Sequence, residues 1–460
     1  MLSSYGIMAE EKDAFADFGG FVGDKRSEVN LADYICEYCA EVHEWEFLID
    51  THLGLLDKDN YHFGNYTGVE GDGLFFSGNI KMQDGEGGYW KTAFQNVGLD
   101  STAVQSAYGI KGSYGFKLDY LNIPVRKYDR LVTPFVNPGS NILVLGNNWS
   151  RSDNAMLFNN ASYSPFSLGT DWDRLGISFN ATGNTNFEFN SSYQRLEKEG
   201  VREFSSTQML SATYLPFPVD QVTEDFGASI DYSAEKWYAS FAVKISRFDN
   251  QFDSVTYETP FTPLVAGSDY ASLATAPDNL ATKLILNARY YYAPKSSVKI
   301  RYSKSKLTQD EEFLPYTTNL NLFTALPQGN LNGEVDTSDL TFLLQHWFSS
   351  EWSFMAKYRN RDRDNKTEQL LFQPVVTDLY IASPLVNLPY DFSKESVTAR
   401  IDYHPFPNHL LSLTYSSDEK TRNYQTVHKT TEDGFTGKYR ATLSEELVLM
   451  IKAQQFDRDG

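Results

Sequence analysis

The sequence predicts an all-β fold, a large antiparallel transmembrane β-barrel. Three observations favour it. Side chains in many segments change character with a period of two, which is typical of strands. Aromatic residues make up 15% of the chain, with 29 Tyr and 32 Phe, as expected where strands meet a membrane interface. No stretch approaches 18 uncharged apolar residues, so a membrane span has to be formed by strands.

The clearest element is the hairpin predicted over residues 226–248. Its first strand places Phe226, Ala228, Ile230 and Tyr232 on one face and small or polar residues on the other. A polar turn at 233–236 follows. The return strand places an apolar set on one face: Trp237, Ala239, Phe241, Val243 and Ile245. Strands that are apolar on one side and edged by aromatic rings are typical of a lipid-facing barrel wall, although a soluble β-sandwich hairpin has the same pattern.

Similar segments recur along the chain and predict about 16 to 18 strands. Before the hairpin we expect strands at 45–56, 74–82, 109–121, 175–180, 187–196 and 208–215. After it we expect strands at 283–292, 298–307, 339–347, 352–360, 397–404, 410–417, 435–443 and 447–456. Short turns and long loops alternate between these later strands. Outer-membrane barrels have short periplasmic turns and long extracellular loops, so we expect the loops 249–282, 308–337 and 361–395 to face outside.

Residues 1–44 are predicted to form a periplasmic, plug-like segment that precedes a barrel over 45–460. This segment contains the two cysteines of the chain, Cys36 and Cys39, in the sequence CEYC. A c-type haem attachment requires C-x-x-C-H, and Ala40 follows Cys39, so we expect no haem to be attached here. Two cysteines do not complete a zinc site. The alternatives are a local disulfide, a thiol pair with a role in export or assembly, or inert packing.

The net charge and the N-terminal residues exclude further classes of protein. The formal net charge is −20, which argues against a general nucleic-acid role because phosphate binding requires excess Lys and Arg. The opening residues MLSSYGIMAEE have no basic region followed by an apolar run, so they do not form a signal peptide. They are typical of a mature exported protein.

The strand residues out of phase with the apolar set are predicted to face the lumen, and many are basic. They include Lys244, Lys283, Arg289, Lys299, Arg301, Lys357, Arg359, Arg400, Lys438, Arg440 and Lys452. Acids are expected mainly in loops, as in DQVTED at 220–225. The wall of any wide barrel is wet and polar, and that alone could explain the basic residues. The alternative is that they face an anionic solute or a protein rich in carboxylates.

No catalytic constellation is present in the sequence. The chain lacks G-x-S-x-G, a P-loop and H-E-x-x-H, and its seven His residues are scattered. DKDN at 57–60 and DRDN at 362–365 do not continue into a calcium loop with its later Glu, so both are predicted to be turns. We therefore expect no enzyme activity, no metal site and no cofactor in this chain.

Several segments together resemble the MtrB/PioB family of outer-membrane barrels. They are CEYC, GFKLDYLNIP, LPFPVDQVTEDFGASIDYSAEKWYASF, YETPF, APDNLATKLIL, TQDEEFLPYT, LNGEVDTSDL, YRNRDRDNKT and FDRDG. The resemblance implies a barrel of 26 strands in the bacterial outer membrane, of which this sequence would hold about two-thirds and lack the C-terminal strands. It also implies a partner: the barrel sheathes a periplasmic decahaem c-type cytochrome and docks an extracellular multihaem cytochrome.

The leading hypothesis is therefore a non-catalytic sheath for extracellular electron transfer, as in metal reduction, with the haems carried by the partner cytochromes. A diffusion porin or solute transporter is the alternative, and it predicts an open channel constricted by an inward loop. A third reading is a soluble β-rich surface protein.

Overall fold

The computed structural model describes residues 45–57, 61–84, 87–151, 163–183, 186–208, 211–380 and 383–460. Residues 44–460 form one compact unit. The segment 1–44, with Cys36 and Cys39, lies outside the described residues, so the predictions about it stay predictions. None of the helical residues in the described ranges belongs to a helix long and apolar enough to cross a membrane.

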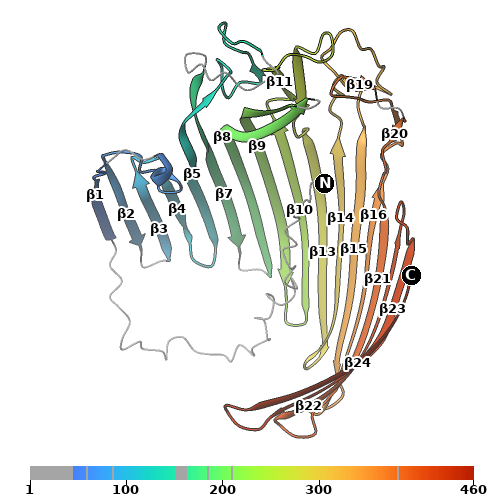
Figure 1. Cartoon of the computed structure of the whole chain (residues 1–460). Helices are drawn as coiled ribbons and strands as arrows, with labels where there is room; N and C mark the ends of the chain where they lie inside the picture. The colour runs from blue at the N-terminus through green and yellow to red at the C-terminus, as the bar shows by residue number, and fades with distance from the viewer. Residues whose placement is uncertain are drawn as a thin grey trace. The chain divides into compact units, whose positions relative to one another are not determined.

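One sheet of 17 strands dominates the structure (Figure 1). Its first strands are β1 (Trp45–Gly54), β2 (Gly73–Gln83), β3 (Gly88–Val97), β4 (Ala103–Ile110), β5 (Tyr114–Thr133), β7 (Ser164–Thr182), β8 (Phe187–Gln208) and β9 (Ser211–Ser233). The later strands are β10 (Trp237–Asn250), β13 (Asn279–Ala293), β14 (Ser296–Gln309), β15 (Gly333–Trp347), β16 (Trp352–Asn365), β21 (Phe392–Tyr403), β22 (His409–Arg422), β23 (Lys429–Thr442) and β24 (Val448–Asp459).

Each strand of this sheet pairs antiparallel with the next one along the chain, and β1 and β24 are its two edges. The all-β antiparallel prediction and the predicted number of strands are both confirmed. The sheet does not close on itself, because no pairing joins β1 to β24.

The two faces of the sheet differ as the period of two predicts. The apolar face carries exposed large side chains such as Phe241, Leu286 and Tyr302, which lie side by side across β10, β13 and β14. The other face is called the polar face below. Cross-strand aromatic pairs edge the apolar face near the short turns: Phe187 with Tyr232, Trp237 with Tyr290, and Trp352 with Tyr403. This arrangement matches a lipid-facing band with an aromatic girdle.

The connections differ between the two ends of the strands. At one end, called the turn end, the connections 84–87, 111–113, 183–186, 234–236, 294–295, 348–351, 404–408 and 443–447 each contain five residues or fewer. At the other, the loop end, the long connections are 55–72, 134–163, 251–278, 310–332 and 366–391. Among the later strands, for which the alternation of short and long connections was predicted, the connection 423–428 between β22 and β23 is an exception, because it is short although it lies at the loop end. Earlier in the chain, the connection 98–102 between β3 and β4 is also short and also lies at the loop end.

Several predicted boundaries are wrong. The strand predicted at 109–121 is interrupted by the turn 111–113, and β3 was not predicted. The sequences DQVTED and DRDN, predicted to be loop and turn, lie inside β9 and β16. These polar stretches continue strands beyond the apolar band, where no apolar partner remains to mark the period of two.

The buried hydrophobic core lies at the loop end rather than within the sheet. Its members are Phe135, Leu143, Leu145, Leu215, Phe217, Val255 and Tyr257. They come from the first residues of β9, from β6 (Ile142–Leu143) and β11 (Ser254–Glu258), and from Phe135 and Leu145, which form a bridge on either side of β6. β12 (Tyr270–Ala274) completes a small sheet with β6 and β11. Leu215 and Phe217 belong to the polar face by strand alternation. Parts of the connections 134–163 and 251–278 therefore fold over the polar face of β9.

The remaining elements are short. They are the 3-10 turn η2 (Tyr61–Gly64) and the strands β17 (Leu371–Phe372), β18 (Val375–Val376), β19 (Leu379–Tyr380) and β20 (Leu385–Val386). The last four form two small hairpins within the connection 366–391.

Candidate functional site: the polar face of β10–β24

The strand register brings the predicted basic residues onto one face. Arg289 lies opposite Lys299, Lys299 opposite Leu343, and Leu343 opposite Lys357. The same register, followed from strand to strand, places Lys244, Lys283, Arg301, Arg359, Arg400, Lys438, Arg440 and Lys452 on this face. All the basic residues singled out in the sequence therefore share the polar face of β10–β24.

This face carries further cations that the sequence analysis missed. Arg361, Arg363, Lys394, Lys420, Arg422 and Arg458 also belong to it. In total it bears 17 Lys and Arg against four Asp and Glu: Asp339, Asp402, Asp418 and Glu432. The sequence prediction ended β16 at residue 360 and assigned Arg361 and Arg363 to a loop. Continuing the period of two beyond residue 360 would have placed both on this face.

Several of these cations lie directly opposite one another. Lys244 faces Lys283, Arg289 faces Lys299, and Lys438 faces Lys452. Near the loop end, Arg361, Lys394 and Lys420 form a row across three strands. Like charges directly opposite destabilise a sheet. The isolated chain therefore bears an electrostatic cost on this face that an anionic neighbour would relieve.

Acids on the same face neutralise only part of this charge. Arg359 donates to both oxygens of Asp339, with Nη2 2.6 Å from Oδ2. Arg400 lies 3.0 Å from Asp402, and Lys394 lies 3.5 Å from Asp418. The expectation that acids lie mainly in loops is therefore too simple, because some of them stand on strands beside these cations.

The polar face of β1–β9 is different. Up to Val125, where β5 becomes irregular, it carries six Lys and Arg and six Asp and Glu. Lys81 lies opposite Glu46 and 3.1 Å from its carboxylate. Asp119 lies 3.9 Å from both Lys117 and Arg174. In this part of the sheet the cations and acids balance in number, although Lys81 also lies opposite Lys91 and Glu188 opposite Asp231.

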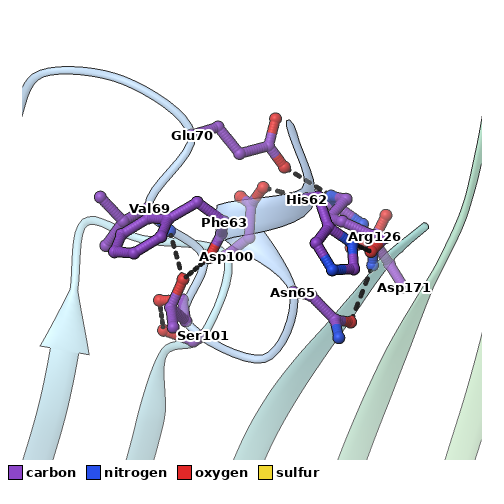
Figure 2. A network of polar contacts seen from close by, with 10 residues as sticks. His62, Phe63, Asn65, Val69, Glu70, Asp100, Ser101, Arg126 and Asp171 are labelled. Carbon is purple, nitrogen blue, oxygen red and sulfur yellow. Dashed lines mark hydrogen bonds and ion pairs between the residues drawn. The ribbon is translucent and has the colours of Figure 1, made fainter. Parts of the chain in front are cut away.

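A buried arginine fixes the loop end of the first strands. Figure 2 shows Arg126 of β5 surrounded by Glu70, Asp100 and Asp171. Its guanidinium donates to Glu70 at 2.5 Å and to Asp100 at 3.0 Å, and lies 2.8 Å from Asp171. Its side chain is 8% exposed. These contacts join the connection 55–72 and the turn 98–102 to β5 and β7.

Tyr61 of η2 completes this cluster. Arg126 lies 5.7 Å from the centre of its ring, and burial raises the pKa of the Tyr61 hydroxyl. Sequence reasoning missed the whole cluster, since its acids lie 26 or more residues from Arg126 in the chain.

A second cluster of hydrogen bonds, around Asp378, joins three long connections. The carboxylate of Asp378 accepts hydrogen bonds from Ser268 and Thr317, and Asn319 Nδ2 lies 3.5 Å from it. Ser268 and Asn319 are almost fully buried. Asp378 has φ of 59° in the turn between β18 and β19. The connections 251–278, 310–332 and 366–391 are therefore held together as one layer, called the loop layer below.

The exposed surface of the loop layer combines apolar side chains with negative charge. Leu320 is 99% exposed and Phe323 is 86% exposed. Leu264, Leu371, Leu385 and Leu388 are also exposed. The three connections contain ten Asp and Glu but only one basic residue, Lys366. Exposed apolar patches of this kind mark interaction sites.

Among the residues that the structure describes, no group of three or more His, Cys, Asp or Glu is placed to hold a metal ion. The predicted absence of a catalytic site stays a prediction.

The alternation of the strands, the apolar face with its aromatic edge and the polar opposite face define an outer-membrane β-barrel protein. Residues 56–460 match the family model described as outer membrane beta-barrel porin, MtrB/PioB. The chain belongs to this family, and the resemblance seen in the sequence is confirmed. It is a protein of the outer membrane.

Comparison with individual proteins adds one relative. "Outer membrane protein MtrB" of Shewanella baltica (strain OS185) is 22% identical over 452 residues, which cover 97% of this chain and 64% of the relative. The chain thus spans less than two thirds of the length of this relative.

Solved structures with detectable similarity include a transporter and an import receptor. The toluene transporter TodX of Pseudomonas putida has a TM-score of 0.26 at 11% identity, over 76% of this chain and 89% of TodX. The ferric-catecholate receptor Fiu of E. coli K12 has a TM-score of 0.33 at 9% identity, over 83% of this chain and 67% of Fiu. At TM-scores this low, the similarity carries no argument about function.

Proposed function

We propose that this protein is a non-catalytic barrel that sheathes a periplasmic multihaem c-type cytochrome and docks an extracellular one. Electrons then cross the outer membrane through haems that the cytochromes carry, and the barrel insulates and positions them. The periplasmic partner lies against the polar face of β10–β24, which we take to be the lumen wall.

The observation that carries this proposal is the excess of cations on that face. Cations placed directly opposite one another cost stability in the isolated chain. A rigid partner with carboxylates and haem propionates on its surface would neutralise them over a wide area. Complementary charge fixes orientation more than it adds affinity, which is the property that a conduit of closely spaced haems requires.

The loop layer supports docking on the opposite side of the membrane. In this proposal the turn end faces the periplasm and the loop end faces outside. The exposed Leu320 and Phe323 provide an apolar centre, and the surrounding carboxylates favour a partner with a cationic rim.

A diffusion porin is the second candidate, and one observation favours it. The small sheet of β6, β11 and β12 covers the polar face of β9, where an inward loop of a porin would form a constriction.

Reconstitution in liposomes tests the proposal. The barrel with its cytochromes is expected to reduce an enclosed dye, and the purified barrel alone is expected to leave the dye oxidised. Electron transfer by the barrel alone would contradict the proposal. A large steady single-channel current through the full complex would favour the porin.

A further inference from the structure

A hollow of about 440 Å³ interrupts the apolar face between β8 and β14. Its floor is a pair of alanines, Ala239 and Ala288, which lie directly opposite each other in the register. Elsewhere on these strands the apolar face carries larger side chains. The two alanines lie within a hollow whose lining extends from Phe187 of β8 to Ile300 of β14.

Larger side chains enclose this floor on all four sides. Tyr232 lies next to Ala239 on β9, and Ile300 lies next to Ala288 on β14. Phe241 and Leu286 form the next cross-strand pair toward the loop end. Toward the turn end, Trp237 and Tyr290 stack with ring centres 4.2 Å apart. The walls are thus aromatic or branched apolar groups at a membrane-facing surface.

Polar and cationic groups stand directly beyond the aromatic wall. Lys236 is in the turn before Trp237, and Lys295 is in the neighbouring turn between β13 and β14. The Lys295 ammonium lies 5.1 Å from the centre of the Trp347 ring, which belongs to the polar face by alternation, so Lys236 is the lysine available beside the hollow. The two turns are adjacent, since the backbone N–H of Tyr291 donates to the carbonyl of Lys236 at 2.9 Å. Glu235 is the acid in the first of these turns. From floor to turn, the order of groups is apolar hollow, aromatic ring and cation.

We infer that this hollow is a binding site for one phospholipid. An acyl chain fills the space above Ala239 and Ala288, the Trp237–Tyr290 pair lies at the level of the glycerol esters, and Lys236 faces the phosphate. The hollow is continuous with the lipid-facing band of an outer-membrane protein, so the molecules that reach it are lipids. Dispersion contacts favour a chain seated in the hollow over one lying on a flat wall, because it touches atoms on several sides.

Photocrosslinking tests this inference. The full chain is reconstituted in vesicles of phosphatidylethanolamine and phosphatidylglycerol that contain a trace of phosphatidylglycerol with a diazirine in its acyl chain. Labelled peptides are then mapped by mass spectrometry. Labelling is expected to concentrate in 237–241 and 286–290. Labelling spread evenly over the apolar face would mean annular lipid only, and it would overturn the site.

A filled hollow provides the matched comparison. The double variant Ala239→Leu with Ala288→Leu is expected to lose the concentrated labelling. The control is Ala356→Leu with Ala399→Leu, a pair that is also directly opposite on the apolar face of β16 and β21. The control is expected to keep the labelling. Equal loss in both variants, with folding shown intact by heat-modifiable gel mobility, would contradict the inference.

The head group is tested separately. Lys236→Gln is expected to lower labelling by the phosphatidylglycerol probe while leaving labelling by a diazirine diacylglycerol unchanged. If both probes label the variant as strongly as the unaltered chain, Lys236 does not bind phosphate and the proposed phospholipid site is wrong.

Discussion

The polar faces of β1–β9 and of β10–β24 belong to one sheet but treat charge differently. In the first stretch, Lys and Arg are matched in number by Asp and Glu, and Lys81 pairs with Glu46 across the strands. In the second stretch, cations outnumber acids by 17 to four, and several face each other. Charges satisfied within the chain serve the fold. Charges left in excess at a cost to the fold are better explained by a partner.

The largest expected effect is on stability and falls in the first stretch. Arg126→Met leaves Glu70, Asp100 and Asp171 close together without their shared cation. We expect a loss of about 2 to 3 kcal/mol, below the roughly 3 to 5 kcal/mol of a fully buried pair, because these carboxylates are partly exposed. Guanidinium unfolding in detergent measures it.

The matched control is Arg130→Met in the same strand, since the Arg130 side chain is 86% exposed. It is expected to leave the unfolding midpoint unchanged. Equal midpoints for both variants would show that the buried cluster is not a structural anchor.

The second prediction concerns partner retention and falls in the second stretch. We expect a triple variant to retain an acidic cytochrome less well. It carries Lys283→Glu, Lys357→Glu and Lys438→Glu. The new carboxylates at 283 and 438 lie opposite Lys244 and Lys452, so the fold gains ion pairs. Solvent-exposed ion pairs are worth about 0 to 1 kcal/mol each, so losing three predicts a loss of up to about 3 kcal/mol, or up to about 150-fold in affinity. Co-purification across a salt series measures this.

A control with the same change of charge belongs to the first stretch. Lys91→Glu, Lys117→Glu and Lys198→Glu lie on the polar face of β3, β5 and β8. Retention by this control should match the unaltered chain. Equal weakening by both triple variants would mean that total charge, rather than the face of β10–β24, holds the partner.

The third prediction concerns the loop layer. Asp378→Gly keeps a residue that tolerates the positive φ but removes the carboxylate that Ser268 and Thr317 contact. Leaving the buried Ser268 hydroxyl and the partly buried Thr317 hydroxyl without their acceptor costs about 1 to 3 kcal/mol locally. Hydrogen exchange should quicken in 251–278 and 310–332. Glu368→Ala in the same connection is the control, and quickening there too would argue against a specific tie at Asp378.

The sequence was sufficient to predict which residues share a face of the sheet. It was not sufficient to predict which residues lie opposite one another on neighbouring strands. A period of two predicts which residues share a face, so the basic residues from Lys244 to Arg440 were found without the structure. It does not reveal that Arg361 continues a strand, because the apolar residues that mark the period end near Asn360. Nor does it reveal that Lys244 meets Lys283, or that Arg359 meets Asp339. These contacts depend on register between strands joined by long connections.

The smallest expected effect is a pH response of the loop layer. Partial burial raises the pKa of Glu311, and Asp278, Asp253, Asp310 and Glu312 raise it further. A carboxyl whose pKa is raised by folding binds more protons when folded, so its contribution to stability grows as pH falls and is lost as pH rises through the folded pKa. Corrected hydrogen exchange near Glu311 should be slower in mild acid than at neutral pH. Glu311→Gln should reduce this difference, and a difference as large as before would assign it to another group.

The most direct test of the partner proposal is site-specific crosslinking from the two faces of one strand. Thr398 lies on the polar face opposite Lys357, and its neighbour Ala399 lies on the apolar face opposite Ala356. A photoreactive amino acid at position 398 should crosslink to a haem-staining protein in intact cells, and at position 399 it should not. Failure of position 398 to crosslink to any protein, together with a steady open-channel current, would contradict the sheath and leave the porin.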